Sequence, residues 1–229
     1  MKRLLSFALC VVLMASFSFA STEGDRAKLE DRLDDAATIM NEIMSAPDKG
    51  IPEEVLNSAQ CVAVVPSMIK ASLGFGGQYG QGVVTCRTQA GWSAPAFYRL
   101  SGGSFGIQIG GQAVDLVMLI MNRKGMEHLM SSKFKLGADA TVAAGPVGRH
   151  AAADTDWKMR AQVLSYSRAR GVFAGLELNG AVVKMDREST LEFYGHIQPV
   201  DQTLATANNP TGALPFLTSL SKWAKIASK

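Results

Sequence analysis

The chain of 229 residues carries 23 Lys and Arg against 20 Asp and Glu, and 47% of its residues are hydrophobic. This length and hydrophobic content suit one domain with a sizeable core. The near balance of charge excludes a strongly basic nucleic-acid-binding protein, and we expect no nucleic-acid partner.

Residues 1–20 have the three parts of an export signal. Lys2 and Arg3 form a basic start, an apolar core follows as far as Met14, and the segment ends on small residues at Ala20. We therefore expect cleavage after Ala20 and an exported, periplasmic or envelope-associated protein. An uncleaved membrane anchor is the alternative.

Residues 21–60 are predicted to form an N-terminal helical segment. Apolar residues at positions 29, 33, 36, 40, 43 and 44 recur at steps of three and four, so they share one face of a helix over 25–46. Pro52 opens a short second helix. The segment holds four basic and ten acidic residues, and its outer face offers a protein partner three acidic side chains, Asp31, Asp34 and Asp35.

Residues 61–200 read as a β-rich body that shares one domain with the helices. A strand begins at Cys61 and is expected to stop at Pro66, and further extended segments lead up to residue 88. Residues 114–122 are apolar on both faces, as a central strand is. A helix is predicted over 123–133, a small-residue strand over 138–149, and two adjacent strands over 161–186. The fold class predicted from these elements is α+β, with a mainly antiparallel, twisted, glycine-rich sheet covered by the N-terminal helices.

The stretch "SGGSFGIQIGGQ" (101–112) holds five glycines and raises the question of a nucleotide site. A dinucleotide fingerprint needs glycines at i, i+2 and i+5 between a strand and a helix, and no trio in this stretch fits. In "GFGGQYGQG", Gly74 and Gly76 would need a third glycine where Tyr79 stands. The alternation of apolar and small residues favours strands with one bare face, which lets another backbone approach closely. We expect no cofactor.

Cys61 and Cys86 are the two cysteines that remain after cleavage, and an even number in an exported chain favours a disulfide. A pair of buried free thiols is the alternative. No histidine lies near either cysteine at ligand spacing, so we expect no metal site.

No catalytic constellation emerges from the remaining polar residues. Ser93 lacks the G-x-S-x-G elbow of a hydrolase. Asp154 and Asp156 form a pair that is typical of a helix cap or a solvated turn. We therefore expect no enzyme activity.

Residues 201–229 are predicted to form a polar linker, which reads as a loop over 202–211, and a C-terminal amphipathic helix over 215–229. Phe216, Leu220 and Trp223 fall on one side of that helix, and Lys222 and Lys225 fall on the other. This pattern is typical of a helix that lies in a bilayer interface. Docking of the same apolar face on the protein's own domain is the alternative.

Several segments in order along the chain resemble the SYLF domain family. They are "VAVVPSMIKASLGFGGQYGQGVV", "GWSAPAFYRLSGGSFGIQIGGQAVDLVMLIMN", "LGADATVAAGPVGR", "SYSRARGVFAGLELNGAVV" and "FYG". The resemblance implies a non-enzymatic, lipid-binding module that often binds phosphoinositides, and yeast members of the family bind actin. An exported chain would not meet cytosolic actin.

The leading hypothesis is therefore binding of anionic phospholipid at a membrane surface of the cell envelope. A structural envelope protein that holds a partner through its acidic helix is the alternative. The basic candidates for lipid contact on the body are Lys70, Arg87, Arg123, Lys124, Lys133, Lys135 and Arg149.

Overall fold

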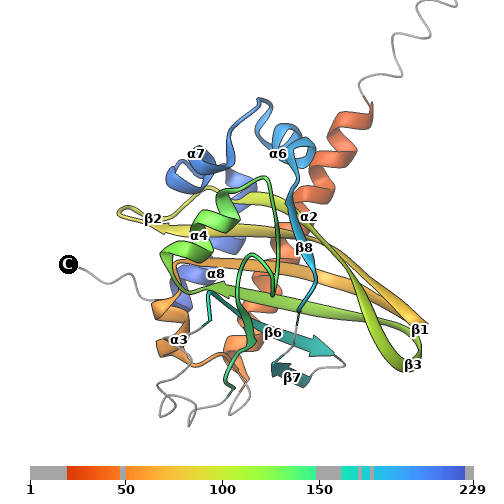
Figure 1. Ribbon diagram of the computed structural model, residues 1–229. Coiled ribbons are helices and arrows are strands. Elements are labelled where there is room, and N and C mark those ends of the chain that lie inside the picture. Colours follow the sequence, from red (N-terminus) through yellow and green to blue (C-terminus); the bar gives the residue numbers. More distant parts are fainter. Residues whose placement is uncertain (1–19, 47–49, 148–160, 170–171, 176–177, 225–229) are drawn as a thin grey trace, which may run out of the picture.

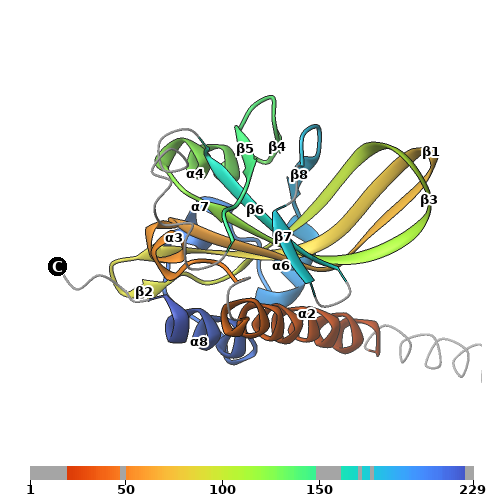
Figure 2. The ribbon, with the colours of Figure 1, turned by 90° about the horizontal axis from the view of Figure 1, so that it is seen from below.

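The computed structural model describes residues 20–46, 50–147, 161–169, 172–175 and 178–224. Its centre is an eight-stranded, mainly antiparallel sheet with helices packed on both faces (Figure 1; Figure 2). This confirms the predicted α+β class. The expected export signal lies outside the described residues, except for Ala20. No described helix is both long and apolar enough to cross a membrane.

The N-terminal helices form where the apolar periodicity and Pro52 predict them. Helix α2 spans Ala20–Ser45 and α3 spans Glu53–Ser58. The apolar face of α2 is buried, with Leu33 and Met40 fully enclosed, whereas Asp34 and Asp35 are exposed. The helix therefore covers the sheet with one face and presents its acidic face to solvent.

Two very long strands, β1 (Cys61–Thr88) and β3 (Ala96–Ile120), form the ribbon on which the fold is built. They pair antiparallel from Cys61 opposite Ile120 to Val84 opposite Ala96, and the end of β1 pairs with the short strand β2 (Gly91–Trp92). Cys61 and Cys86 form a disulfide although 25 positions separate them in one strand. A straight strand would place them about 80 Å apart. The ribbon must therefore fold back on itself, as its loop in Figure 2 shows.

The fold-back of the ribbon depends on glycines that lack a side chain where its two halves meet. A Cβ on Gly82 would lie 2.5 Å from the carbonyl oxygen of Val64 and 2.7 Å from the ring of Tyr98. A Cβ on Gly80 would overlap the side chain of Val65. This confirms that bare strand faces here serve close backbone approach. The side chains of residues 72–75 and 104–110 lie outside the described ones.

Pro66 does not end the first strand, contrary to the prediction. The register between β1 and β3 shifts between Val65 and Met68, so a β-bulge takes Pro66 and Ser67 out of the ladder. The amide of Ser67, whose φ is 49°, donates to Asp115 Oδ1 at 3.0 Å. Pro66 has no backbone N–H to donate to the ladder. Because it lies in the bulge, no ladder hydrogen bond is required there, and the strand continues beyond it.

The bulge is also fixed by an ion cluster that joins the sheet to α2. Arg168 on β6 (Val163–Ala169) donates to Asp115 Oδ2 from two nitrogens, at 2.8 and 2.6 Å, and also contacts the carboxylate of Glu42. Asp115 and Arg168 are direct cross-strand partners. One arginine therefore ties two strands, the bulge and α2 together.

The rest of the sheet comprises β4 (Lys133–Lys135), β5 (Val142–Ala144), β6 (Val163–Ala169), β7 (Val172–Gly175) and β8 (Val182–Met185). Helix α4 (Arg123–Met130) confirms the helix predicted there, and β5 is much shorter than the strand expected over 138–149. The prediction of two strands over 161–186 is wrong. β6 and β7 form a hairpin, whereas β8 lies apart from them between β3 and β4.

The C-terminal region is more helical than expected. Helices α6 (Arg187–Tyr194) and α7 (Val200–Ala205) and the 3-10 turn η2 (Thr211–Ala213) precede α8 (Leu214–Trp223). The loop expected over 202–211 is therefore partly helical. The sheet is also covered by these helices and by α4, not by the N-terminal helices alone.

Helix α8 docks on the protein's own domain, beside α2 (Figure 2). Ser219 Oγ donates to the carbonyl oxygen of Ala37 at 3.2 Å, and Trp223 Nε1 donates to Asn41 Oδ1 at 2.9 Å. Phe216 and Leu220, which were expected to enter a bilayer, are fully buried in this contact. The alternative of a docked helix is the one observed.

Side chains alternate between two cores on opposite faces of the sheet. Val62 and Val64 face the core beneath α2, α3 and α8, whereas Cys61, Ala63 and Val65 face the core beneath α4, α7 and β4. Because both faces of the ribbon are buried at the start of β1 and the end of β3, residues 61–65 and 114–120 read as nearly continuous apolar runs.

Candidate functional site

Three exposed lysines gather where β8 lies between β3 and β4. Lys133 on β4 is the direct cross-strand partner of Lys184 on β8, and Lys184 is in turn the partner of Arg99 on β3. Cross-strand partners share a face of the sheet, and Lys135 shares it because it lies two residues after Lys133. We call Lys133, Lys135 and Lys184 the basic row.

Two carboxylates beside the basic row are engaged by Arg99, and a third, that of Asp139, accepts from the backbone amide of Lys135 at 2.7 Å. Asp186 accepts from Arg99 Nε at 2.7 Å and from Arg99 Nη2 at 3.0 Å, and Glu188 accepts from the same Nη2 at 3.3 Å. Within the described part of the chain, the ammonium groups of the basic row have no ion pair. Like charges directly opposite each other destabilise a sheet. A bound anion would relieve that repulsion.

Asp186 is a buried carboxylate that is held charged. Burial alone would raise its pKa, but hydrogen bonds from Arg99 and from the backbone and hydroxyl of Ser189 outweigh this and lower it. The hydrogen bonds that Arg99 donates to Asp186 in turn raise the pKa of the Arg99 guanidinium. Asp186 also caps the N-terminus of α6. The pair of Arg99 and Asp186 therefore holds the junction between β8 and α6 against β3.

The basic row opens onto a basic cleft of about 420 Å³, lined by Arg99, Lys133, Lys184 and Arg187 together with Asp186 and Glu188. A second cleft, of about 500 Å³, adjoins it. Its lining is mainly apolar and includes Phe97, Met130, Met185, Leu191, Ile197 and Val200. We call this second cavity the apolar cleft. Its rim exposes two large apolar side chains, Ile197 at 81% and Leu191 at 41% of their surface.

The two clefts are neighbours that share part of their walls, because Ser132, Met185, Arg187 and Glu188 line both of them. The elements that meet here are the end of α4, the end of β8 and helices α6 and α7, which lie close together in Figure 1. The site can therefore hold an amphiphile whose anionic end faces the basic row and whose apolar end enters the apolar cleft.

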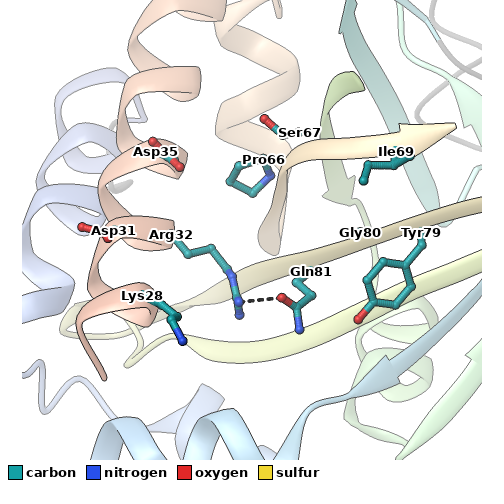
Figure 3. Close-up of a pocket in the computed structure, with 10 residues that line it drawn as sticks. All are labelled: Lys28, Asp31, Arg32, Asp35, Pro66, Ser67, Ile69, Tyr79, Gly80 and Gln81. Atoms are coloured by element: carbon teal, nitrogen blue, oxygen red, sulfur yellow. Dashed lines mark hydrogen bonds between the residues drawn. The ribbon is translucent and has the colours of Figure 1, made fainter. Parts of the chain in front are cut away.

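A separate cavity of about 410 Å³ lies between α2 and the folded ribbon (Figure 3). Arg32 reaches into it and donates from Nη2 to Gln81 Oε1 at 2.8 Å. Burial lowers the pKa of Arg32, and its Nη1 is buried without a hydrogen-bond partner among the described residues. Lys28, Asp31 and Asp35 bring charges of both signs to the rim. Because charges of both signs line this cavity, it favours neither an anionic nor a cationic ligand.

The predicted lipid-contact residues do not form one surface. Lys133 and Lys135 belong to the basic row. Arg123 and Lys124 are exposed on α4, where Arg123 pairs with Glu127. Lys70 lies on the ribbon, where burial lowers its pKa.

Arg87 serves the interior of the fold. It donates to the carbonyl oxygens of Ala59 at 2.9 Å and Leu56 at 3.2 Å, and its guanidinium lies 4.7 Å from the Trp92 ring centroid. Lys222 lies over the ring of Trp223 on α8. Arg149 and Lys225 lie outside the described residues.

Sequence reasoning missed two residues of the site, Lys184 and Arg99. The segment "VVKMD" places Lys184 at an outward position of a strand, which is a visible signal. Its alignment with Lys133 was not visible, because the strand pairing joins segments about 50 residues apart.

Ser93 has a structural role. Its hydroxyl is fully buried, accepts from the amide of Cys86 at 3.0 Å and lies 3.1 Å from Thr85 Oγ1. Asp154 and Asp156 lie outside the described residues. No group of three potential metal ligands occurs among the residues that the structure describes.

Comparison with known proteins relates the chain to one family. The family model described as Ysc84, Las17-binding protein actin regulator, matches residues 101–223. SH3 domain-containing YSC84-like protein 1 of Xenopus laevis is 35% identical over 167 residues, which are 70% of this chain and 50% of the frog protein. LAS seventeen-binding protein 3 of Saccharomyces cerevisiae (strain S288c) is 33% identical over 159 residues, 68% of this chain and 34% of the yeast protein. The chain thus spans half or less of these relatives.

Proposed function

The chain belongs to the Ysc84, or SYLF, family, and from this premise we propose that it is a non-enzymatic protein that binds anionic phospholipid at a membrane surface. The observation that supports the proposal is the basic row, in which three exposed lysines share one sheet face without carboxylate partners among the described residues. The pattern of residues 1–20 points to the membrane of the cell envelope as the place of action.

The energetic argument rests on charge near a lipid surface. Each lysine close to an anionic bilayer contributes about 1 kcal/mol. Three lysines on one face therefore supply about 3 kcal/mol, which is enough for reversible adhesion and makes it sensitive to salt. The exposed Leu191 and Ile197 beside the row add apolar surface that a bilayer can cover.

Sedimentation with liposomes tests this proposal. We expect the protein to sediment with vesicles of phosphatidylcholine and phosphatidylglycerol, and to remain in solution with phosphatidylcholine alone. The double variant Lys133→Gln, Lys184→Gln should bind the anionic vesicles about thirtyfold more weakly, because two lysines contribute about 2 kcal/mol together. Lys222→Gln, the same change on α8, is the matched control and should bind like the parent protein. Equal sedimentation of the parent with both kinds of vesicle, or of both variants with the anionic vesicles, would contradict the proposal.

A second candidate function is the binding of a basic protein partner by α2. The supporting observation is that Asp31, Asp34 and Asp35 are exposed on the helix face that points away from the core. The relatives' names include binding to another protein, Las17. A pull-down with the triple Asp→Asn variant should then recover less partner than the parent does, while binding to anionic vesicles stays the same. Equal recovery would exclude a role for this acidic face.

A further inference from the structure

We propose that the apolar cleft holds one acyl chain of the anionic lipid whose phosphate the basic row binds. This inference rests on the proposed function and extends it, because it makes the protein a receptor for an individual lipid molecule. Charge on a sheet face would by itself give only adhesion to a surface.

The first argument is the position of the two clefts, which share part of their walls. Met185 and Arg187 line both of them, so the basic cleft and the apolar cleft lie next to each other. Lys184 and Met185, consecutive residues at the end of β8, both line the basic cleft. A cation and an apolar side chain therefore meet at the boundary between the two clefts.

The second argument is the character of the apolar cleft. A volume of about 500 Å³ lies within the range of small-molecule sites in proteins, roughly 300–1,000 Å³. Phe97, Met130 and Met185 form part of its wall, so the surface that an occupant would contact is largely apolar. Ile197 and Leu191 stand at the rim, where removing their exposed surface from water would favour an apolar ligand.

The third argument decides between an acyl chain and other apolar occupants. Lys133, Lys184 and Arg187 line the basic cleft, which adjoins the apolar cleft, and Arg187 lines both. Glu188 and Asp201 also line the apolar cleft, but Glu188 accepts from Arg99. An amphiphile with one phosphate and one hydrocarbon tail complements both halves of the site. A neutral apolar ligand would leave the lysines unpaired.

Calorimetric titration with three soluble probes tests the inference. Lysophosphatidic acid, kept below its micellar concentration, carries both the phosphate and a single chain, and it should bind saturably at one site per protein. Glycerol 3-phosphate carries only the anionic part and should bind at least about tenfold more weakly, because it leaves the apolar cleft empty. Lysophosphatidylcholine, which has the chain but no net negative charge, should also bind more weakly.

Two isoleucine variants make the test specific to the cleft. Ile197→Asp places a carboxylate at the rim of the apolar cleft and should weaken binding of lysophosphatidic acid about tenfold or more. Ile69→Asp is the matched control, because Ile69 is also exposed, at 58%, and lies at the separate cavity of Figure 3. Both substitutions are at exposed positions, and circular dichroism will show that both variants fold.

The outcomes separate this inference from the proposed function. If anionic vesicles bind the parent but glycerol 3-phosphate binds as tightly as lysophosphatidic acid, the acyl-chain site is refuted and surface binding stands. Equal weakening by the two isoleucine variants would likewise refute it. If neither vesicles nor any probe binds, the proposed function fails together with the inference.

Discussion

The close approach of the two ribbon halves at Gly82 gives the sharpest test of this fold. In Gly82→Ala the new methyl carbon would stand 2.5 Å from the carbonyl oxygen of Val64 and 2.7 Å from the ring of Tyr98. Ordinary contacts of this kind are longer than about 3.4 Å, and the backbone oxygen belongs to a paired strand that cannot retreat alone. Overpacking of a well-packed core costs about 1–3 kcal/mol. We place this substitution at the upper end, about 3 kcal/mol.

The measurement is thermal and urea unfolding of the oxidised protein. In a domain of this size, 1 kcal/mol corresponds to about 2–4 °C, so Gly82→Ala should lower Tm by about 6–12 °C. Gly111→Ala is the matched control in the same ribbon, because no heavy atom lies within 4 Å of a Cβ built there. It should leave Tm unchanged or raise it by a degree or two, since alanine restricts the unfolded chain. Equal stability of the two variants would refute the folded-back ribbon.

Three further predictions concern interactions on either side of the ribbon. Replacing both cysteines of the disulfide by alanine should cost about 3 kcal/mol, the chain-entropy value for a loop of 25 residues, measured by urea unfolding. Asp186→Asn should cost about 2 kcal/mol at pH 7, because it weakens the hydrogen bonds from Arg99. The lowered pKa of Asp186 means that this stabilisation is present above the ordinary value of 3.8 and is lost as the pH falls through the lowered pKa, so the difference between the parent and the variant should shrink in the acid range; a constant difference would contradict this assignment. Gln81→Leu should cost about 2 kcal/mol by leaving the guanidinium of Arg32 without its acceptor, whereas adding Arg32→Met should restore most of that loss in the same unfolding assay.

Local sequence patterns predicted the structure correctly where that structure depends mainly on residues close together in the chain. The spacing of apolar residues predicted the long N-terminal helix, because a buried helix face needs steps of three and four. The parity of the cysteines predicted the disulfide. The glycines were read correctly as sites of close packing, and Gly82 shows why: any side chain there would displace the backbone of Val64.

The path of the ribbon was not predictable from such patterns. Pro66 reads as the end of a strand because proline cannot donate to a sheet ladder. The structure places it in a bulge, where Asp115 receives the neighbouring amide of Ser67 and the strand continues. That acceptor comes from another strand 48 residues away, so no local rule reveals it.

Only part of the candidate site could be predicted from the sequence, for the same reason. Lys133 and Lys135 are among the basic candidates, but the helix predicted over 123–133 includes Lys133, whereas the structure places both lysines on β4 on either side of the buried Phe134. Their meeting with Lys184 depends on register, which the intervening chain sets through the packing of the second core. Phe216 and Leu220 illustrate the opposite error. The sequence pattern of an amphipathic helix is the same whether lipid or the protein's own core covers its apolar face. The contact between α8 and α2 shows that the core covers it here.

The pairing of α2 with α8 has a consequence for how the molecule is made. A ribosome makes α2 well before α8, yet the two helices contribute to the same core (Figure 2). The apolar face of α2 therefore gains its last packing partner only after α8 has been synthesised, and this core is among the later parts of the molecule to be completed.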